Sequence, residues 1–406
     1  MNTNSQSKQL SIHREEGAAL ITVLLVSTLL LAAGGALILT TSMATTTAAD
    51  STAEAQAYYA TEAGINLAVN VLRGNSTSAT RANFRNVADN PNMNQWFTYQ
   101  TVGSKNLVVV SASPSLGYDI LATDPDGTLA PAVPRRLLLQ VNGYGPKGSR
   151  KRMEMLVDRH AFDYTPLATI LMRGNDDGTT PISPFTIGDS NAKTYSGNDH
   201  YSTPTNPIPV FGTTNGTDLA GVTTTVNDSK PTTVSGVDQV AQFDNSDLPS
   251  FLQTADNARA FLDIMQATAQ ANGRYFTSTP ASFGTSANPK LTFVDGDADL
   301  FSGAGLLIVT GTLTLSGPPS FNGLILVLGK GAITRDGGGN GDIYGGIIIA
   351  SFERTWPAAE NNDPHPFLSP TYTTGGGGNS TVGFDSAEID RALSIAGLRV
   401  MAIREH

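Results

Sequence analysis

The stretch AALITVLLVSTLLLAAGGALIL begins at Ala18, ends at Leu39 and decides how this chain is organised. It contains no charged residue, and 22 residues in a helix span about 33 Å, enough to cross a bilayer core of about 30 Å. Its polar interruptions, Thr22, Ser27 and Thr28, can bond back to helical carbonyl oxygens. The stretch therefore predicts one membrane-spanning helix.

The charges on either side of this stretch predict its orientation. Lys8 and Arg14 precede it, and no Lys or Arg follows until Arg73. The positive-inside rule then places the N-terminus in the cytoplasm and the rest of the chain outside. Small residues near Ala44 leave a cleaved secretory signal open as an alternative, and an ordinary signal anchor is another.

The residues that follow the apolar stretch continue a helical pattern. Residues 44–73 are rich in Ala, and Ala57, Ala60, Ile65 and Ala68 recur near helical spacing. Gly74 can end such a helix. We expect one helix of about 55 residues that includes the membrane span.

Two sequence motifs in this region carry a family resemblance. HREEG, ending at Gly17 and followed by AALI from Ala18, resembles a prepilin leader that prepilin peptidase cuts between these two residues. The words AYYATEAG, residues 57–64, resemble the A-x-x-A-x-E-A-G signature of PilX N-terminal domains. The matching positions are Ala57, Ala60, Glu62, Ala63 and Gly64. The N-terminal region that carries both motifs, residues 1–74, makes up about a fifth of the chain.

The resemblance implies a minor pilin of the type IV pilus, a structural protein of a priming or tip complex with roles in adhesion and twitching motility. Its implied partners are other minor pilins, the major pilin, prepilin peptidase and a large tip adhesin. It also implies the bacterial inner membrane and then the pilus or cell surface, methylation of the new N-terminus, and no cofactor. Thr22 stands where most prepilins carry Glu. PilX-like proteins and GspK-type pseudopilins often lack this Glu, so a tip pseudopilin of type II secretion stays an alternative.

Composition bounds the rest of the 406-residue chain. Only 15% of residues are charged, while Gly (41) and Pro (22) are abundant, which is typical of turn-rich β structure. The net charge of −10 without a long basic run disfavours nucleic-acid binding. The absence of Cys excludes disulfides and thiolate metal sites.

Alternating patterns predict an antiparallel sheet after the helix. Apolar alternation at residues 107–110, 118–122, 136–141 and 152–157 indicates four strands, joined by Gly-rich and Pro-rich turns. We expect an α+β fold. The expected divisions are a leader at 1–17, the membrane and pilin helix at 18–74, an antiparallel β head at 75–164, a loop-rich β region at 165–290 and a β-solenoid-like region at 291–406.

The C-terminal region contains apparent repeats. GLLIV, GLILV and GIIIA begin at Gly305, Gly323 and Gly346, and residues 312–317 resemble residues 332–337. Short apolar strands at intervals near 20 residues predict stacked coils of a β-solenoid, with Gly-rich turns at 337–340 and 375–379. A plain β-sandwich remains the alternative. Helices are expected at residues 256–270 and 386–393.

Motifs for chemistry are sparse, and no enzyme is predicted. Asp295, Asp297 and Asp299 have the spacing of loop ligands for Ca²⁺, but the Gly and Glu of an EF-hand are missing. Asp176 and Asp177 resemble the aspartates of inverting polysaccharide hydrolases, but their Gly-rich surroundings favour a turn.

The remaining motif candidates stay open in the same way. The five histidines lack metal spacing, so we expect them on the surface. Phe352 and Trp356 would cap a core or hold a partner strand or sugar. A membrane-anchored solenoid that binds or degrades polysaccharide is therefore the alternative from another functional class.

Overall fold

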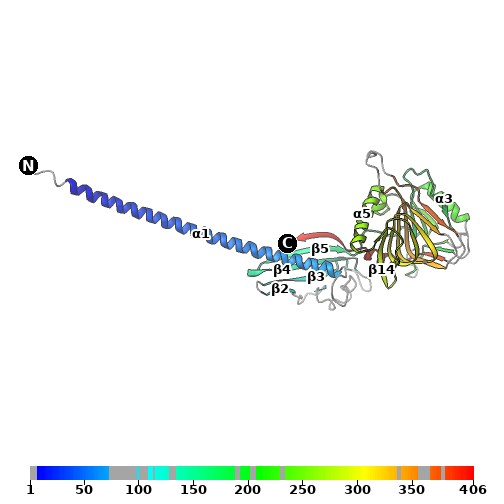
Figure 1. Cartoon of the computed structure of the whole chain (residues 1–406), viewed down its shortest axis with the longest axis horizontal. Coiled ribbons are helices and arrows are strands. Elements are labelled where there is room, and N and C mark those ends of the chain that lie inside the picture. Colours follow the sequence, from blue (N-terminus) through cyan, green and yellow to red (C-terminus); the bar gives the residue numbers. More distant parts are fainter. Residues whose placement is uncertain are drawn as a thin grey trace, which may run out of the picture. The chain divides into compact units, whose positions relative to one another are not determined.

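The computed structural model describes residues 7–72, 98–99, 108–112, 115–127, 134–187, 193–201, 207–228, 234–335, 340–354, 366–375 and 380–406. Its contacts divide the chain into unit 1 (residues 1–156 and 402–406) and unit 2 (residues 157–401). The fold is α+β, as expected, with a long N-terminal helix and sheet-rich bodies (Figure 1). Residues 337–339, residues 376–379 and Trp356, for which turns or an aromatic anchor were expected, lie outside the described residues.

Unit 1 joins helix α1 (Ser7–Leu72) to one sheet (Figure 1). The helix is continuous, so the prediction of a single long helix is confirmed, and it also includes part of the expected leader. The strands of the sheet are β1 (Thr98–Tyr99), β2 (Val108–Ser111), β3 (Leu116–Thr123), β4 (Arg136–Tyr144), β5 (Arg150–Asp158) and β21 (Arg399–Glu405).

The sheet has the order β1-β3-β4-β5-β21, with β2 beside β3. β3 pairs antiparallel with β2 and with β4, while β1 runs parallel to β3. In β4 the side chains of Leu137, Leu139 and Val141 are fully buried and alternate with half-buried ones, as the period of two in a strand requires. The four strands expected here are confirmed, whereas β21 has no counterpart among the predicted elements.

Unit 2 is built on a sheet of 15 strands. Its strands are β6 (Ile170–Arg173), β7 (Phe185–Thr186), β8 (Lys193–Ser196), β9 (Phe211–Thr213), β10 (Val234–Ser235), β11 (Val240–Gln242), β12 (Tyr275–Phe276), β13 (Gly284–Thr285), β14 (Asn288–Val294), β15 (Ala298–Val309), β16 (Thr312–Gly329), β17 (Ala332–Arg335), β18 (Gly341–Ser351), β19 (Thr371–Thr374) and β20 (Ser380–Phe384). Its helices are α3 (Gly216–Asp228), α4 (Ser250–Gln253), α5 (Ala255–Ala271) and α6 (Ser386–Ile395). Helices α5 and α6 pack against the central ladder of this sheet.

Strands of this sheet pair in parallel wherever the described residues show a pairing, except for the antiparallel pair β13 and β14. Within the long ladder β14-β15-β16-β18, Ile308 lies beside Leu326, and Leu326 lies beside Ile348. The resemblance between residues 312–314 and 332–334 also corresponds to a direct pairing, of β16 with β17. Segments with similar sequences therefore lie on neighbouring strands of the sheet.

The apolar runs of the ladder are buried on both faces. Leu307 and Ile325 point into one core cluster, which also holds Phe211 and Tyr372. The alternate residues, such as Ile308, belong to a second cluster with Leu, Met, Ile and Ala side chains from α5 and α6. Continuous rather than alternating hydrophobicity is what a strand buried on both faces requires.

The register of the third repeat differs from the one that the sequence words suggest. Gly323 pairs with Gly305 and with Gly345, not with Gly346. All three paired glycines have positive φ, at 118°, 141° and 135° in chain order, a region that other residues rarely adopt. The alignment on Gly346 is therefore wrong by one residue, because backbone conformation sets the register.

Parallel, in-register strands are compatible with stacked coils, but a solenoid is not established. β6, which comes early in unit 2, pairs with β18, and β9 pairs with β6, so the strand order departs from chain order. Strands from the expected region 165–290 share this sheet with strands from 291–406. The solenoid and the domain boundaries stay predictions.

Candidate functional site: the N-terminal helix

The N-terminal part of α1 is an apolar surface without partners of its own. Residues 17–70 are long and apolar enough to cross a membrane, and the most apolar 18-residue window has a mean hydropathy of 2.4 and no buried residue. Leu20, Leu31 and Ile38 are exposed by 71%, 81% and 72%. The hydroxyls of Thr22, Ser27 and Thr28 donate to backbone oxygens one turn earlier, which confirms their expected back-bonding and leaves the helix surface apolar.

The expected processing site lies within the same helix. Gly17 and Ala18 belong to α1, and the space where a Cβ on Gly17 would lie is empty. Thr22, at the fifth position after the expected cut, donates its hydroxyl to the Ala18 carbonyl oxygen over 2.7 Å. Cleavage between Gly17 and Ala18 stays a prediction.

The C-terminal part of α1 packs against β3 and β4 in unit 1 (Figure 1). Two glycines of β4 and its following turn permit this close approach. A Cβ on Gly143 would lie 2.3 Å from the carbonyl oxygen of Ala57, and one on Gly145 would lie 2.7 Å from that of Ala53. The buried helix positions are Ala53, Ala57, Ala60, Thr61, Gly64, Ile65, Ala68 and Leu72.

The residues of the A-x-x-A-x-E-A-G match divide between two faces of the helix. Ala57, Ala60 and Gly64 are buried against the sheet, and a Cβ on Gly64 would lie 2.6 Å from Val141. Glu62 and Ala63 are exposed on the opposite side. The three small residues of the match therefore fit the helix to its own sheet, and the other two remain accessible.

Ion pairs at the surface also connect the helix with the sheet and its turn. Lys147 pairs with Asp50 over 3.0 Å, and Lys151 pairs with Glu54 over 3.1 Å. Lys151 also contacts Glu405 of β21 over 3.5 Å. Hydrogen bonds to Glu54 and Glu405 hold the pKa of Lys151 above its ordinary value, so this ammonium group stays charged between the helix and the sheet.

The calcium candidates do not form a metal site in this arrangement. Asp295 accepts hydrogen bonds from Thr310 and Tyr275, each over 2.9 Å, and forms an ion pair with Arg354. Asp297 accepts the Thr312 N–H over 2.6 Å, and Asp299 is exposed in β15. Across the described ranges, no group of three or more His, Cys, Asp or Glu could hold a metal ion. The calcium site stays a prediction that this geometry does not support.

Asp176 and Asp177 lie in a turn, which confirms the sequence-based interpretation. Asp177 accepts the backbone N–H groups of Thr179 and Thr180 over 2.6 and 3.0 Å. These bonds lower the pKa of the Asp177 carboxyl to about 2, the opposite of what a general acid in glycoside hydrolysis needs. Asp176 pairs with Arg173 and accepts the Phe367 N–H over 2.8 Å.

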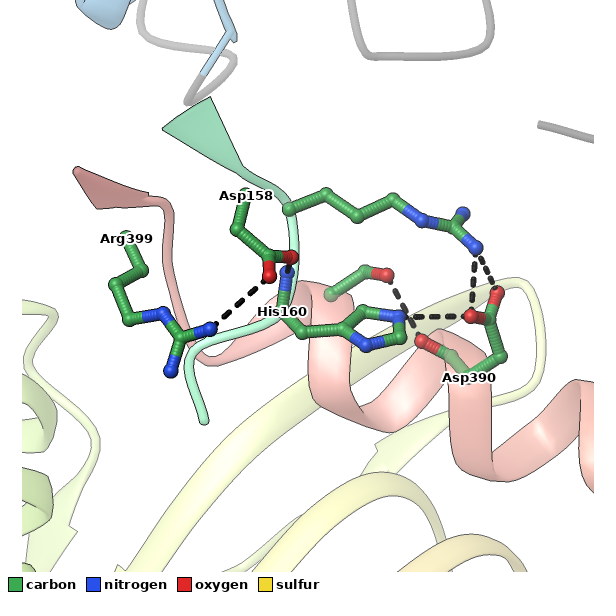
Figure 2. Close-up of polar contacts among 6 residues, drawn as sticks. Asp158, His160, Asp390 and Arg399 are labelled. Atoms are coloured by element: carbon green, nitrogen blue, oxygen red, sulfur yellow. Dashed lines mark hydrogen bonds and ion pairs between the residues drawn. The ribbon is translucent and has the colours of Figure 1, made fainter. Parts of the chain in front are cut away.

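One polar cluster in unit 2 has no counterpart in the sequence-based predictions (Figure 2). His160 is buried, so the expectation that all histidines are on the surface is wrong, and its Nε2 lies 2.7 Å from Asp390 Oδ1. Arg159 contacts both Asp390 oxygens at 2.6 Å, and Arg399 contacts Asp158 at 3.1 Å. The local signal in the sequence was the charged run from Asp158 to His160 at the end of β5.

Comparisons with known proteins leave the family open. No protein-family model matches the chain, and no curated protein matches it either. Among solved structures, it is similar to the competence-associated pilin ComZ from Thermus thermophilus, with 12% sequence identity. The match covers 87% of this chain and 98% of that chain, with a TM-score of 0.22. At that score the likeness supports no argument about fold or function.

Proposed function

We propose that this chain is a pilin-like structural subunit that is anchored in a membrane by α1 and assembles with other pilin-type subunits through that helix. The observation that carries this proposal is the division of α1 into an exposed apolar part and a part seated on its own sheet. An apolar surface of this size is not stable in water. Lipid would cover it before assembly, and apolar helices of other subunits would cover it afterwards.

The finer role rests on the sequence motifs. The leader ending at Gly17 and the match at residues 57–64 favour a PilX-like minor pilin that primes or tips a type IV pilus. In that role the two units of the body would face outward and serve adhesion or twitching motility. Thr22 in place of Glu is equally compatible with a GspK-like tip pseudopilin of type II secretion.

The mature N-terminus tests the pathway. Mass spectrometry of the chain made with and without prepilin peptidase should give a peptidase-dependent start at Ala18, carrying an N-methyl group. A Gly17→Leu variant should remain uncut, whereas Gly34→Leu, in the same helix and equally free of neighbours, should be cut normally. A chain that keeps Met1, or that begins beyond residue 40, would overturn the proposal.

Crosslinking tests assembly through the helix. Because the chain has no Cys, single cysteines can be placed at will. Leu31→Cys, at an exposed position, should crosslink to other subunits in assembled material, whereas Ala60→Cys, at a position with 5% exposure, should not. Equal crosslinking at both positions would argue against a specific helix interface.

A further inference from the structure

Strand β21 (Arg399–Glu405) lies at the open edge of the unit 1 sheet, with β5 on its other side. We propose that two copies of this chain join along this edge, each β21 running antiparallel to its counterpart about a two-fold axis at Ala402. The sheets of the two copies then continue into one another. This inference does not rest on the pilin role, because α1 takes no part in the contact.

Other strands at the edges of the described sheets have features that hinder such pairing. Strands β1, β10 and β12 have two residues each, and the pairing of β2 with β3 contains a register shift beside Val109. Short edge strands and bulges both discourage pairing with another chain. β21 has seven residues, and residues 400–403 at its centre include neither a charge nor a Pro. Its length and sequence therefore permit an added strand.

The side chains of β21 leave apolar surface exposed on both faces. Val400 lies on one face, and Met401 and Ile403 lie on the other, because side chains alternate along a strand. Met401 is 45% exposed and Ile403 is 57% exposed. A second strand placed alongside would cover part of this surface, and burial of apolar surface favours association.

The backbone of β21 directs hydrogen-bonding groups toward the open edge. Directly after the strand, the His406 N–H donates to the Arg152 carbonyl oxygen of β5 over 2.9 Å. Successive residues of a strand direct these groups to opposite sides, so Ala402 faces β5, whereas Met401 and Ile403 face away from it. An added antiparallel strand would bond to the N–H and C=O groups of Met401 and Ile403.

The sequence of β21 is complementary to its own reverse, which selects a second copy as the partner. Ala402 is the midpoint of the strand, so an axis there pairs the strand over its whole length. Arg399 then lies opposite Glu405, and both pairings of this kind favour the contact. Each of these two charges is also paired within its own chain, so the new contact extends existing ion pairs.

The same axis agrees with the backbone directions. Met401 and Ile403 lie opposite each other as a hydrogen-bonded pair, since both face the open edge, and Ala402 meets Ala402 of the second copy as a non-hydrogen-bonded pair. A two-fold contact uses the open edge of both copies and therefore stops at a dimer.

Cysteine crosslinking of the full chain in detergent micelles tests the partner and the register, because the chain has no Cys of its own. Ala402→Cys should form a disulfide-linked dimer under mild oxidation, since the Cα atoms of a non-hydrogen-bonded pair are about 4.5 Å apart. Val400→Cys and Arg404→Cys should each stay monomeric alone, because each position lies about 13 Å along the strand from its own copy. An equal mixture of these two variants should crosslink, because positions 400 and 404 are opposite each other.

Two results would overturn the pairing. One is an Ala402→Cys chain that stays monomeric under oxidation. The other is a Val400→Cys chain that crosslinks by itself as efficiently as Ala402→Cys, since that would indicate random collision or another register.

Light scattering in micelles measures the same contact without a crosslink. The dissociation constant of the wild-type dimer should rise by about tenfold or more in Ile403→Lys, because two added positive charges then lie close to the axis. Val237→Lys, at a side chain that is also 57% exposed but lies outside β21, should leave it unchanged. Thermal unfolding of both variants checks that they fold. A dimer that forms equally well in Ile403→Lys would place the association on another surface and overturn the proposal.

Discussion

Gly323 lies directly beside Gly305 in the parallel ladder of unit 2, and a Cβ on Gly323 would fall 2.0 Å from the Gly305 carbonyl oxygen. Gly345 repeats the relationship, with a Cβ position 1.8 Å from the Gly323 carbonyl oxygen. The three strands can approach one another here only because this row of positions lacks side chains. The row fixes the register of the long ladder.

Gly323→Ala should destabilise unit 2 by about 3 kcal/mol or more, because the new methyl group meets backbone and φ is 141°. Chemical denaturation of the full chain, followed through the unfolding transition of unit 2, measures the change. Gly221→Ala is the control, because nothing lies within 4 Å of its Cβ position in α3. This variant should raise the free energy of unfolding of unit 2 by about 0.5 kcal/mol. Similar effects of both variants would contradict the importance of the glycine row.

Ala60→Leu should lower the free energy of unfolding of unit 1 by about 1 to 3 kcal/mol, because the larger side chain must enter the packed space between α1 and the sheet of unit 1. Ala63→Leu, on the exposed face, should change the unfolding free energy of unit 1 by less than about 0.5 kcal/mol. Thermal unfolding and limited proteolysis in micelles distinguish the two variants. Equal losses would mean that Ala63 also packs against the body.

Asp177 should titrate at about 2 in the folded chain, against its ordinary 3.8. Because the folded pKa is the lower one, this group's contribution to stability is present above about pH 4 and disappears as the pH falls toward 2. Carboxyl NMR of the folded chain reads the midpoint directly. Asp177→Ala should make the free energy of unfolding less dependent on pH over this acid range. An Asp177 midpoint near 4 would contradict the turn geometry.

Arg173→Lys should lower the free energy of unfolding of unit 2 by about 2 to 4 kcal/mol, although the positive charge is kept. The guanidinium donates to the carbonyl oxygens of Leu252 and Gly174 over 3.1 and 2.8 Å, and lies over the Phe367 ring. An ammonium group cannot make these contacts from one position. Arg152→Lys, at a side chain that is 45% exposed, should leave the free energy of unfolding nearly unchanged. An equally small effect of Arg173→Lys would show that the planar guanidinium group of Arg173 is not needed for stability. Denaturant midpoints for both variants make the comparison.

Features that depend on neighbouring residues in the chain were predictable. The apolar run from Ala18 to Leu39, the helical spacing up to Leu72 and the alternation in β4 are properties of short windows, and each appears in the structure. Helix α5 was predictable for the same reason, because its apolar positions recur on one face. The turn at Asp177 followed from Gly and Asp in adjacent positions.

Residue types alone determined that this chain has one long apolar helix followed by β-rich bodies, because hydrophobicity and its period are local quantities. Tertiary structure alone decided which surfaces meet. β21 joins the sheet of unit 1 from the far end of the chain, Gly345 rather than Gly346 aligns with Gly323, and His160 meets Asp390 across 230 positions of sequence. Such pairs are selected by backbone conformation, close packing and burial of charge, and these arise only when distant segments come together.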